Sequence, residues 1–153
     1  MFNFPHFQVM LDYAHNEGAY IELKKYLSTV KKARKIGVIS VAGDRRIIDM
    51  QRIGFYAAEI FDEIIIKHDK NSRGNTNENI TQALKEGILS SKCHPRVEVI
   101  SDEFTAVKQA LEKATPDSFI FYSPEKVFKA IEFIKNQQEA YKQNHLIPES
   151  TSL

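Results

Sequence analysis

Short apolar runs and amphipathic stretches alternate along this chain from near its start to about residue 140. The runs are rich in Val and Ile, which is typical of strands that are buried on both faces of a sheet. The stretches between them repeat apolar residues every three or four positions, which predicts helices with one buried side. We expect strands over residues 7–13, 36–41, 63–67, 96–100 and 118–122.

Helices are expected to alternate with these strands. The first two cover about residues 18–32 and 48–61. Asn77 and Ser101 are the expected N-caps of the third and fourth, because short polar side chains accept hydrogen bonds from a helix's first turn. The fifth is expected to begin at Ser123 and Pro124, since proline suits the first position of a helix. Its expected buried side consists of Val127, Phe128, Ile131 and Ile134.

This alternation predicts an α/β fold. We expect a Rossmann-like, mostly parallel sheet of about five or six strands with helices on both faces. A chain of 153 residues fits one domain, which we assign to residues 1–140. The polar composition of residues 141–153 predicts a tail.

Composition and charge restrict the classes of function. A formal net charge of +1 gives no general attraction to nucleic acids or anionic membranes, so neither is an expected partner. Cys93 is the only cysteine, which excludes an intrachain disulfide and favours a reducing compartment. The sequence has no apolar run near the roughly 20 residues of a membrane span, and its start lacks a signal-peptide pattern. We therefore expect a cytoplasmic protein. The spacing of His and Cys predicts no metal site.

Three polar clusters follow or end predicted strands, at residues 12–16, 43–46 and 68–74. Ligands of open parallel sheets bind outside the carboxyl ends of the strands. The three clusters together therefore predict one site for an anionic ligand with several parts.

Each cluster also has a simpler interpretation. Asp12 can accept hydrogen bonds from a ribose diol and His15 can lie near a phosphate or a base, or Asp12 can cap the next helix while His15 is solvated. Gly43 allows close approach of a ligand, and Arg45 and Arg46 can hold phosphate oxygens, or the segment is a surface turn. The mixed charges of the third cluster suit a zwitterion, or the loop is only solvated.

The three clusters, in order, resemble the C-terminal domain of the Mur ligase family, and within it the corresponding domain of cyanophycin synthetases. Residues 12–16 read D-Y-A-H-N and residues 43–46 read G-D-R-R, as these ligases do. The run from Ile64 through Lys67 to Asp69, Arg73 and Glu78 is similar to the family's passage from the third strand into its substrate loop. The resemblance spans about residues 7–140.

The resemblance implies ATP-dependent amide ligation, in which ATP phosphorylates a carboxylate and an amine attacks the acyl phosphate. ATP and Mg²⁺ would serve the parent enzyme, held mostly by other domains. The implied nucleotide-binding residues are Asp12, His15 and Asn16. The implied loop near phosphate and substrate is Gly43, Asp44, Arg45 and Arg46. The implied amino-acid site, for a substrate such as arginine, is Asp69, Arg73, Gly74 and Glu78.

The sequence contains no P-loop motif of the form G-K-[ST], and we assign no catalytic residue within this domain. The expected partner is therefore the central P-loop domain of a ligase, in the same or another chain, and ligation by this chain alone is not expected. The alternative is a stand-alone module of the same fold that binds an amino acid or another protein. A phosphorylated signalling receiver would need paired acidic residues at the first strand end, where only Asp12 stands.

Overall fold

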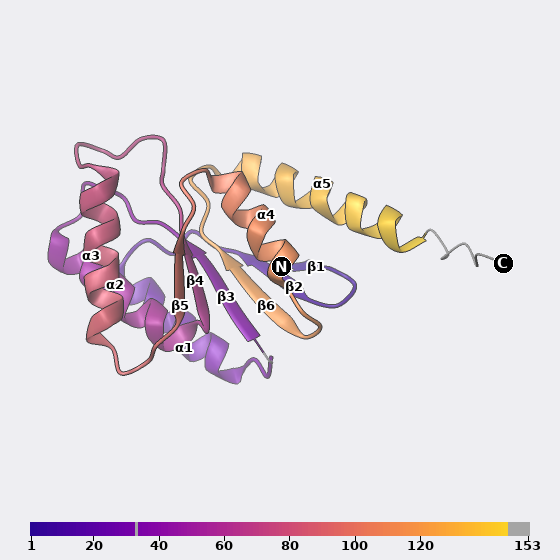
Figure 1. Cartoon of the computed structure of the whole chain (residues 1–153), viewed down its shortest axis with the longest axis horizontal. Helices are drawn as coiled ribbons and strands as arrows, with labels where there is room; N and C mark the ends of the chain where they lie inside the picture. Colours follow the sequence, from indigo (N-terminus) through magenta and orange to yellow (C-terminus); the bar gives the residue numbers. More distant parts are fainter. Residues whose placement is uncertain (33, 147–153) are drawn as a thin grey trace.

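The structure is a computed structural model that describes residues 1–32 and 34–146. Within them, six strands form one sheet and five helices cover it (Figure 1). The strands are β1 (Phe2–Asn3), β2 (Gln8–Leu11), β3 (Arg34–Ile39), β4 (Glu63–Ile66), β5 (Arg96–Val99) and β6 (Ser118–Tyr122). The helices are α1 (Glu17–Thr29), α2 (Ile47–Ile60), α3 (Asn77–Ser90), α4 (Glu103–Lys113) and α5 (Val127–Leu146).

The strand order is β1-β2-β6-β3-β4-β5, and all neighbours are parallel except β1 and β2. The predicted Rossmann-like, mostly parallel sheet is confirmed. The antiparallel β1 was not predicted, because two residues are too short to show a periodic pattern. Its Phe2 pairs with Val9 and closes the outer side of β2.

Alternate residues of each strand enter two separate cores. On β6, Phe119 and Phe121 pack with α1, α2 and α3, whereas Ile120 and Tyr122 pack with α4 and α5. Figure 1 shows the same division, with α1, α2 and α3 on one face of the sheet and α4 and α5 on the other. All four of these β6 side chains are buried, as expected for a central parallel strand.

Two predicted helix caps are wrong by one residue. Thr76, not Asn77, caps α3 by accepting a hydrogen bond from the Asn79 amide at 3.1 Å. Asp102, not Ser101, caps α4 by accepting from the Thr105 amide at 2.9 Å. The hydroxyl of Ser101 is hydrogen-bonded instead to the His68 ring, which explains the second error.

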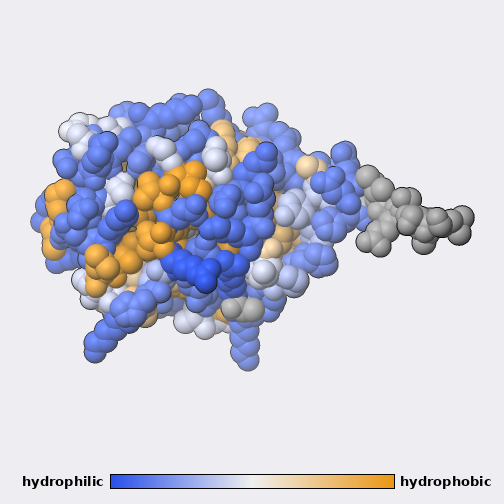
Figure 2. Space-filling model, viewed as in Figure 1, coloured by the Kyte–Doolittle hydropathy of each residue, from blue (hydrophilic) through white to orange (hydrophobic). Residues whose placement is uncertain are grey.

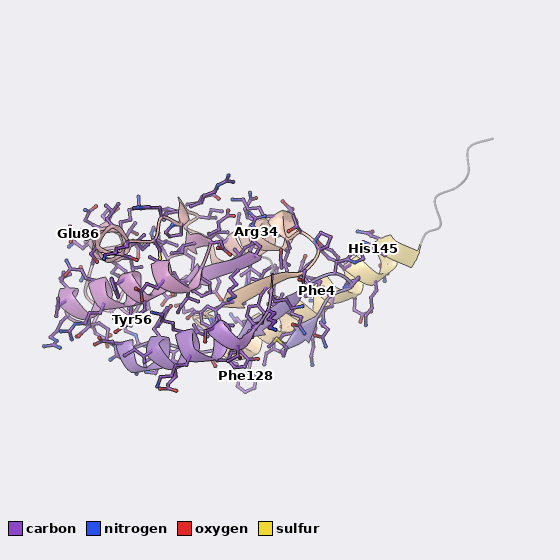
Figure 3. All side chains as sticks on the ribbon, turned by 90° about the horizontal axis from the view of Figure 1, so that it is seen from below. Phe4, Arg34, Tyr56, Glu86, Phe128 and His145 are labelled. Atoms are coloured by element: carbon purple, nitrogen blue, oxygen red, sulfur yellow. The ribbon has the colours of Figure 1, made fainter. Side chains whose placement is uncertain are left out.

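The start of α5 also differs from the prediction. The Ser123 amide donates to the Val38 carbonyl at 3.0 Å, so the chain continues along β3 and the helix begins only at Val127. Phe128, predicted to be buried, is 89% exposed, and Figure 3 shows its ring pointing away from the ribbon. Val127, also predicted to be buried, is exposed as well, and the buried side of the helix includes Ala130 and Ile134.

The helix α5 continues through Leu146, so the predicted tail is helical over residues 141–146, and residues 147–153 lie outside the described residues. Tyr141 anchors this last part of the helix. Its ring meets those of Phe4 and Phe7 edge-on, with centroids 5.2 and 5.6 Å apart. Such aromatic pairs add about 0.5–1.5 kcal/mol beyond the area they bury. The division into domain and tail stays a prediction.

The surface over α3 and the edge strand β5 carries most of the hydrophobic area visible in Figure 2. Leu89, Val97 and Val99 are exposed large apolar residues of these elements. No helix in the described part of the chain is both long enough and apolar enough to span a bilayer.

Candidate functional site

A pocket of about 380 Å³ opens at the carboxyl edge of the sheet. The segments that follow β2, β3, β4 and β6 line it. Three of the predicted site residues, His15, Asp69 and Arg73, are among the lining residues. The first and third predicted clusters therefore both contribute residues to this pocket.

The pocket lining carries both acidic and basic side chains. Asp69 and Glu125 supply carboxylates, while Lys70, Arg73 and Lys126 supply cationic groups. A guanidinium binds a carboxylate through paired hydrogen bonds, and a carboxylate accepts hydrogen bonds from an ammonium or a guanidinium. The lining is chemically suited to a zwitterion such as an amino acid.

Lys67 lies beneath this pocket with a fully buried side chain. Its ammonium donates to Ser40 Oγ at 3.0 Å, to Asp69 Oδ1 at 2.9 Å and to Glu103 Oε2 at 3.0 Å. All three protons of the ammonium therefore have acceptors, which a buried charge requires. Ser40 also donates to Asp69 Oδ1, at 2.9 Å.

Glu103 extends this network to the neighbouring strand end. Its Oε1 accepts a hydrogen bond from the Tyr122 hydroxyl, and its Oε2 accepts one from the Glu125 amide at 3.2 Å. Burial raises the pKa of Tyr122, and the hydrogen bond to the Glu103 carboxylate raises it further, so Tyr122 remains a neutral donor. The Glu125 carboxylate in turn accepts the amides of Lys70 and Asn71, at 3.1 and 3.3 Å. We call this set the Lys67 network: Ser40, Lys67, Asp69, Glu103, Tyr122 and Glu125.

Three carboxylates of this network, on Asp69, Glu103 and Glu125, have oxygens within 4.8 Å of one another. Such a group can hold a metal ion. Here the ammonium of Lys67 bonds two of the three, so the protein supplies a cation of its own at this position.

The loop that carries Arg73 runs from His68 to Thr76, and it stands above the sheet at the upper left of Figure 1. Arg73 has a φ of 49°, in the left-handed region that costs a side chain free energy. Its amide donates to Asn71 Oδ1 at 3.0 Å, and its guanidinium lies 3.4 Å from Asp44 Oδ2. The His68 ring is hydrogen-bonded on both nitrogens, to Ser101 and to Thr81. This loop is thus anchored at its base, with the half-exposed Arg73 side chain at its outer turn.

Gly43 joins the second cluster to this loop. A Cβ on Gly43 would lie 1.9 Å from the Ser72 carbonyl oxygen, so only glycine permits the approach of the two segments. Arg46, three residues on, forms two hydrogen bonds with Asp49, at 2.8 and 3.0 Å, and these lower the pKa of Asp49. Arg45 lines a second pocket, of about 240 Å³, together with His15 and other residues of the α1 and α2 N-termini.

In the first cluster, Asn16 has a structural role, whereas Asp12 and His15 have side-chain atoms that can contact a ligand. Asn16 caps α1 by accepting from the Ala19 amide at 2.9 Å, so the interpretation that Asp12 is the cap is wrong. Asp12 is exposed and its amide donates to the Tyr122 carbonyl at 3.1 Å. The His15 Nδ1 lies 2.9 Å from the Tyr13 carbonyl oxygen, which leaves the other ring nitrogen for a ligand.

The remaining predicted residues lie outside the main pocket. Gly74 and Glu78 are exposed and do not line it, although both belong to the predicted amino-acid site. The sequence interpretation missed Ser40, Glu103 and Glu125. The structural role of Lys67 was also missed, although the sequence contained a signal for it. A lysine that directly follows three isoleucines of a buried strand needs buried hydrogen-bond acceptors. Glu103 and Glu125 gave no such signal, since each stands among ordinary polar residues at a helix start.

Comparisons with known proteins agree with this fold and with the predicted resemblance. The model of the family "Mur ligase, glutamate ligase domain" matches residues 3–126. The cyanophycin synthetase of Nostoc sp. strain PCC 7120 is 35% identical over 135 residues, which are 88% of this chain and 15% of that protein. The chain therefore spans about one sixth of the length of this curated relative.

Solved structures show the same architecture. A UDP-N-acetylmuramoyl-L-alanyl-D-glutamate–2,6-diaminopimelate ligase superimposes with a TM-score of 0.72 at 22% identity, over 89% of this chain and 31% of that one. Escherichia coli FolC in complex with ADP superimposes with a TM-score of 0.67 at 19% identity, over 86% and 29%. At these identities the two structures support the fold alone. The match ends just before α5. Because the family model covers most of the chain, this chain belongs to the family of Mur ligase glutamate ligase domains.

Proposed function

We propose that this chain is the substrate- and nucleotide-contacting domain of an ATP-dependent ligase that joins an amino acid to a carboxylate. The observation that carries the proposal is the pocket in which Arg73 faces the same space as Asp69 and Glu125. Membership of the Mur ligase family supplies the reaction class. The length matched in the relatives leaves room for other domains in a parent protein.

The pocket would bind the incoming amino acid by its two charges. Arg73 would hold the carboxylate through its guanidinium, and Asp69 with Glu125 would hold a cationic group of the substrate. Arginine suits this arrangement, because its second cationic group can use the second carboxylate. Glu78, which lies outside the pocket, is left out of this assignment.

The nucleotide would lie toward the first cluster. Asp12 would bind the ribose, and His15 with Arg45 would face the phosphate side, since both line the second pocket. ATP and Mg²⁺ are the proposed co-substrate and ion, and the cation would offset phosphate charge during transfer to the carboxylate. Holding the acyl phosphate and the amine together accounts for much of the rate enhancement in such a reaction.

The polyphosphate itself needs a P-loop, which the sequence does not contain, so a central ligase domain is the proposed partner. Exposed apolar residues stand on three of the segments at the carboxyl edge and favour docking there. Tyr13 follows β2, Ile47 and Ile48 open α2, and Phe128 lies in the first turn of α5. Exposed apolar groups of this kind mark interaction surfaces. Without that partner, the chain would bind ligands but would not catalyse ligation.

Titration of the 15N-labelled chain with L-arginine, followed by NMR, tests this proposal. We expect saturable shifts of the amides of residues 69–73, lost in Arg73→Ala and in Asp69→Asn. Glu78→Gln is the matched control, because it removes a charge in the first turn of α3, directly after the loop and outside the pocket, and it should bind as the wild type does. L-lysine, L-aspartate and L-glutamate are the comparison ligands. Shifts with another amino acid alone would reassign the substrate, and no saturable shift with any of the four would overturn the amino-acid site.

A further inference from the structure

We infer that Lys67 is a positioning residue that fixes the loop of Arg73 without touching the pocket contents. Its side chain has no exposed surface and does not line the pocket, so it acts only through its partners. The inference rests on the proposed function in that Arg73 is taken as a ligand-binding group. The structural part of it, the fixing of the loop, stands on the hydrogen bonds alone.

The connection begins at the loop's first residues. Lys67 follows the last residue of β4, and its amide donates to the Ile39 carbonyl at 2.9 Å. The position of its ammonium is therefore set by the sheet itself. This ammonium holds Asp69, two residues on, at 2.9 Å, and so fixes the direction in which the chain leaves the strand.

A second connection reaches the middle of the loop by a longer route. The ammonium holds Glu103 at the start of α4, and Glu103 accepts the amide of Glu125. The Glu125 carboxylate then accepts the amides of Lys70 and Asn71. The loop backbone is thus held from two sides by carboxylates that one buried cation orients.

Electrostatics make the cation indispensable to this arrangement. Asp69 and Glu103 are two like charges close together, and both have largely buried side chains, with 19% and 14% exposed. Without the ammonium between them, their mutual repulsion would drive the two carboxylates apart. That movement would release Glu125 from its place and, with it, the loop amides that Glu125 accepts.

The backbone conformation of Arg73 requires support from its surroundings. A residue with a φ of 49° holds a conformation that a free loop would leave, and its amide is tied to Asn71, whose own amide is held by Glu125. Strained backbone of this kind persists only where the surroundings hold it. The Lys67 network supplies that hold.

Amide hydrogen exchange on the whole chain tests the inference. The informative variant is the double substitution Lys67→Met with Glu103→Gln, which removes the cation and one carboxylate together and keeps the net charge. We expect the amides of Lys70 and Asn71 to exchange about tenfold faster or more, because each loses its hydrogen bond to the charged Glu125 carboxylate. Exchange in β3 and β6 should be unchanged. Lys67→Met alone should show the same pattern wherever it folds.

Glu63→Gln is the matched control, since it breaks a buried ion pair at the opposite edge of the sheet. A role in stability alone would predict equal acceleration at Lys70 and Asn71 in the control and the double variant, and that result would overturn the inference. L-arginine binding separates the two proposals. A dissociation constant raised about tenfold in the folded double variant, from the same lost hydrogen bonds, supports positioning of Arg73, and an unchanged one refutes it. If the wild type binds no amino acid, the proposed function fails, while the exchange data still decide whether Lys67 fixes the loop.

Discussion

Glu63 accepts a hydrogen bond from the Lys113 ammonium at 2.6 Å, at the end of the sheet opposite the pocket. Arg34 donates to the other carboxylate oxygen of Glu63, which is 3% exposed. Burial acts to raise the pKa of Glu63, but the hydrogen bonds from Lys113 and Arg34 outweigh it, and the pKa lies below its ordinary value. The buried carboxylate is therefore charged in the folded protein.

Glu63→Gln should lower the free energy of unfolding by about 1–3 kcal/mol at pH 7, because the two partly exposed cations lose their shared acceptor. Since the folded pKa lies below the unfolded one, this contribution is present above about pH 5 and is lost as the pH falls below about 4. Urea unfolding of both proteins at pH 7 and at pH 3.5 measures it. Glu22→Gln, in an exposed pair with Lys25, is the control and should change stability little at either pH. An equal loss at both pH values for Glu63→Gln would contradict the ionic explanation.

Tyr20→Phe should leave stability unchanged or raise it by about 1 kcal/mol. The Tyr20 hydroxyl is completely buried and has no hydrogen-bond partner among the described residues, and burial raises its pKa. An unpaired buried hydroxyl costs free energy that phenylalanine avoids. Tyr122→Phe is the opposite case, because its hydroxyl donates to Glu103, and it should destabilise by about 1–3 kcal/mol. Thermal unfolding of both variants measures the contrast, and a clear loss in Tyr20→Phe would mean that its hydroxyl has a partner.

Gly87→Ala should destabilise the protein by about 1–3 kcal/mol although alanine favours helices by about 1 kcal/mol. The new Cβ would lie 1.8 Å from the Gln51 carbonyl oxygen, at the contact of α2 with α3. Gly18→Ala in α1 provides the comparison, since the nearest atom there lies at an ordinary 3.4 Å. That change should stabilise by about 0.5–1 kcal/mol. The two midpoints of urea unfolding should move in opposite directions, and a shift of both in the same direction would refute the packing argument.

Phe128→Ser should change the free energy of unfolding by less than about 0.5 kcal/mol, because the ring is 89% exposed. Ile134→Ala, two turns further along the same helix, should cost about 2–5 kcal/mol, since Ile134 is completely buried. Chemical denaturation of the two variants checks both values. A large loss in Phe128→Ser would show that the ring packs against this chain in solution.

The sequence was sufficient for the five parallel strands and for the edge of the sheet at which the candidate pocket opens. The Val- and Ile-rich runs became β3 and β4 within one or two residues, since strands buried on both faces must be apolar throughout. The prediction that Phe128 is buried was wrong, because the spacing of apolar residues does not reveal that the first turn of α5 lies beyond the sheet. The roles of Glu103 and Glu125 in the Lys67 network could not be predicted from the sequence, for another reason. Their role depends on three strand ends and a helix start meeting around one ammonium, and pairings across such long stretches of chain leave no local pattern.

The contact of Gly43 with the Ser72 carbonyl makes the G-D-R-R turn and the Arg73 loop one interlocking piece. Exchange of one segment alone for that of a relative would change one side of this close contact and leave the other side as it is. A chimera that imports a relative's loop alone would place a foreign backbone against Gly43, so its failure would say nothing about the specificity of the imported loop. A test of the proposed amino-acid site by loop exchange should therefore transplant residues 43–46 and 68–76 together.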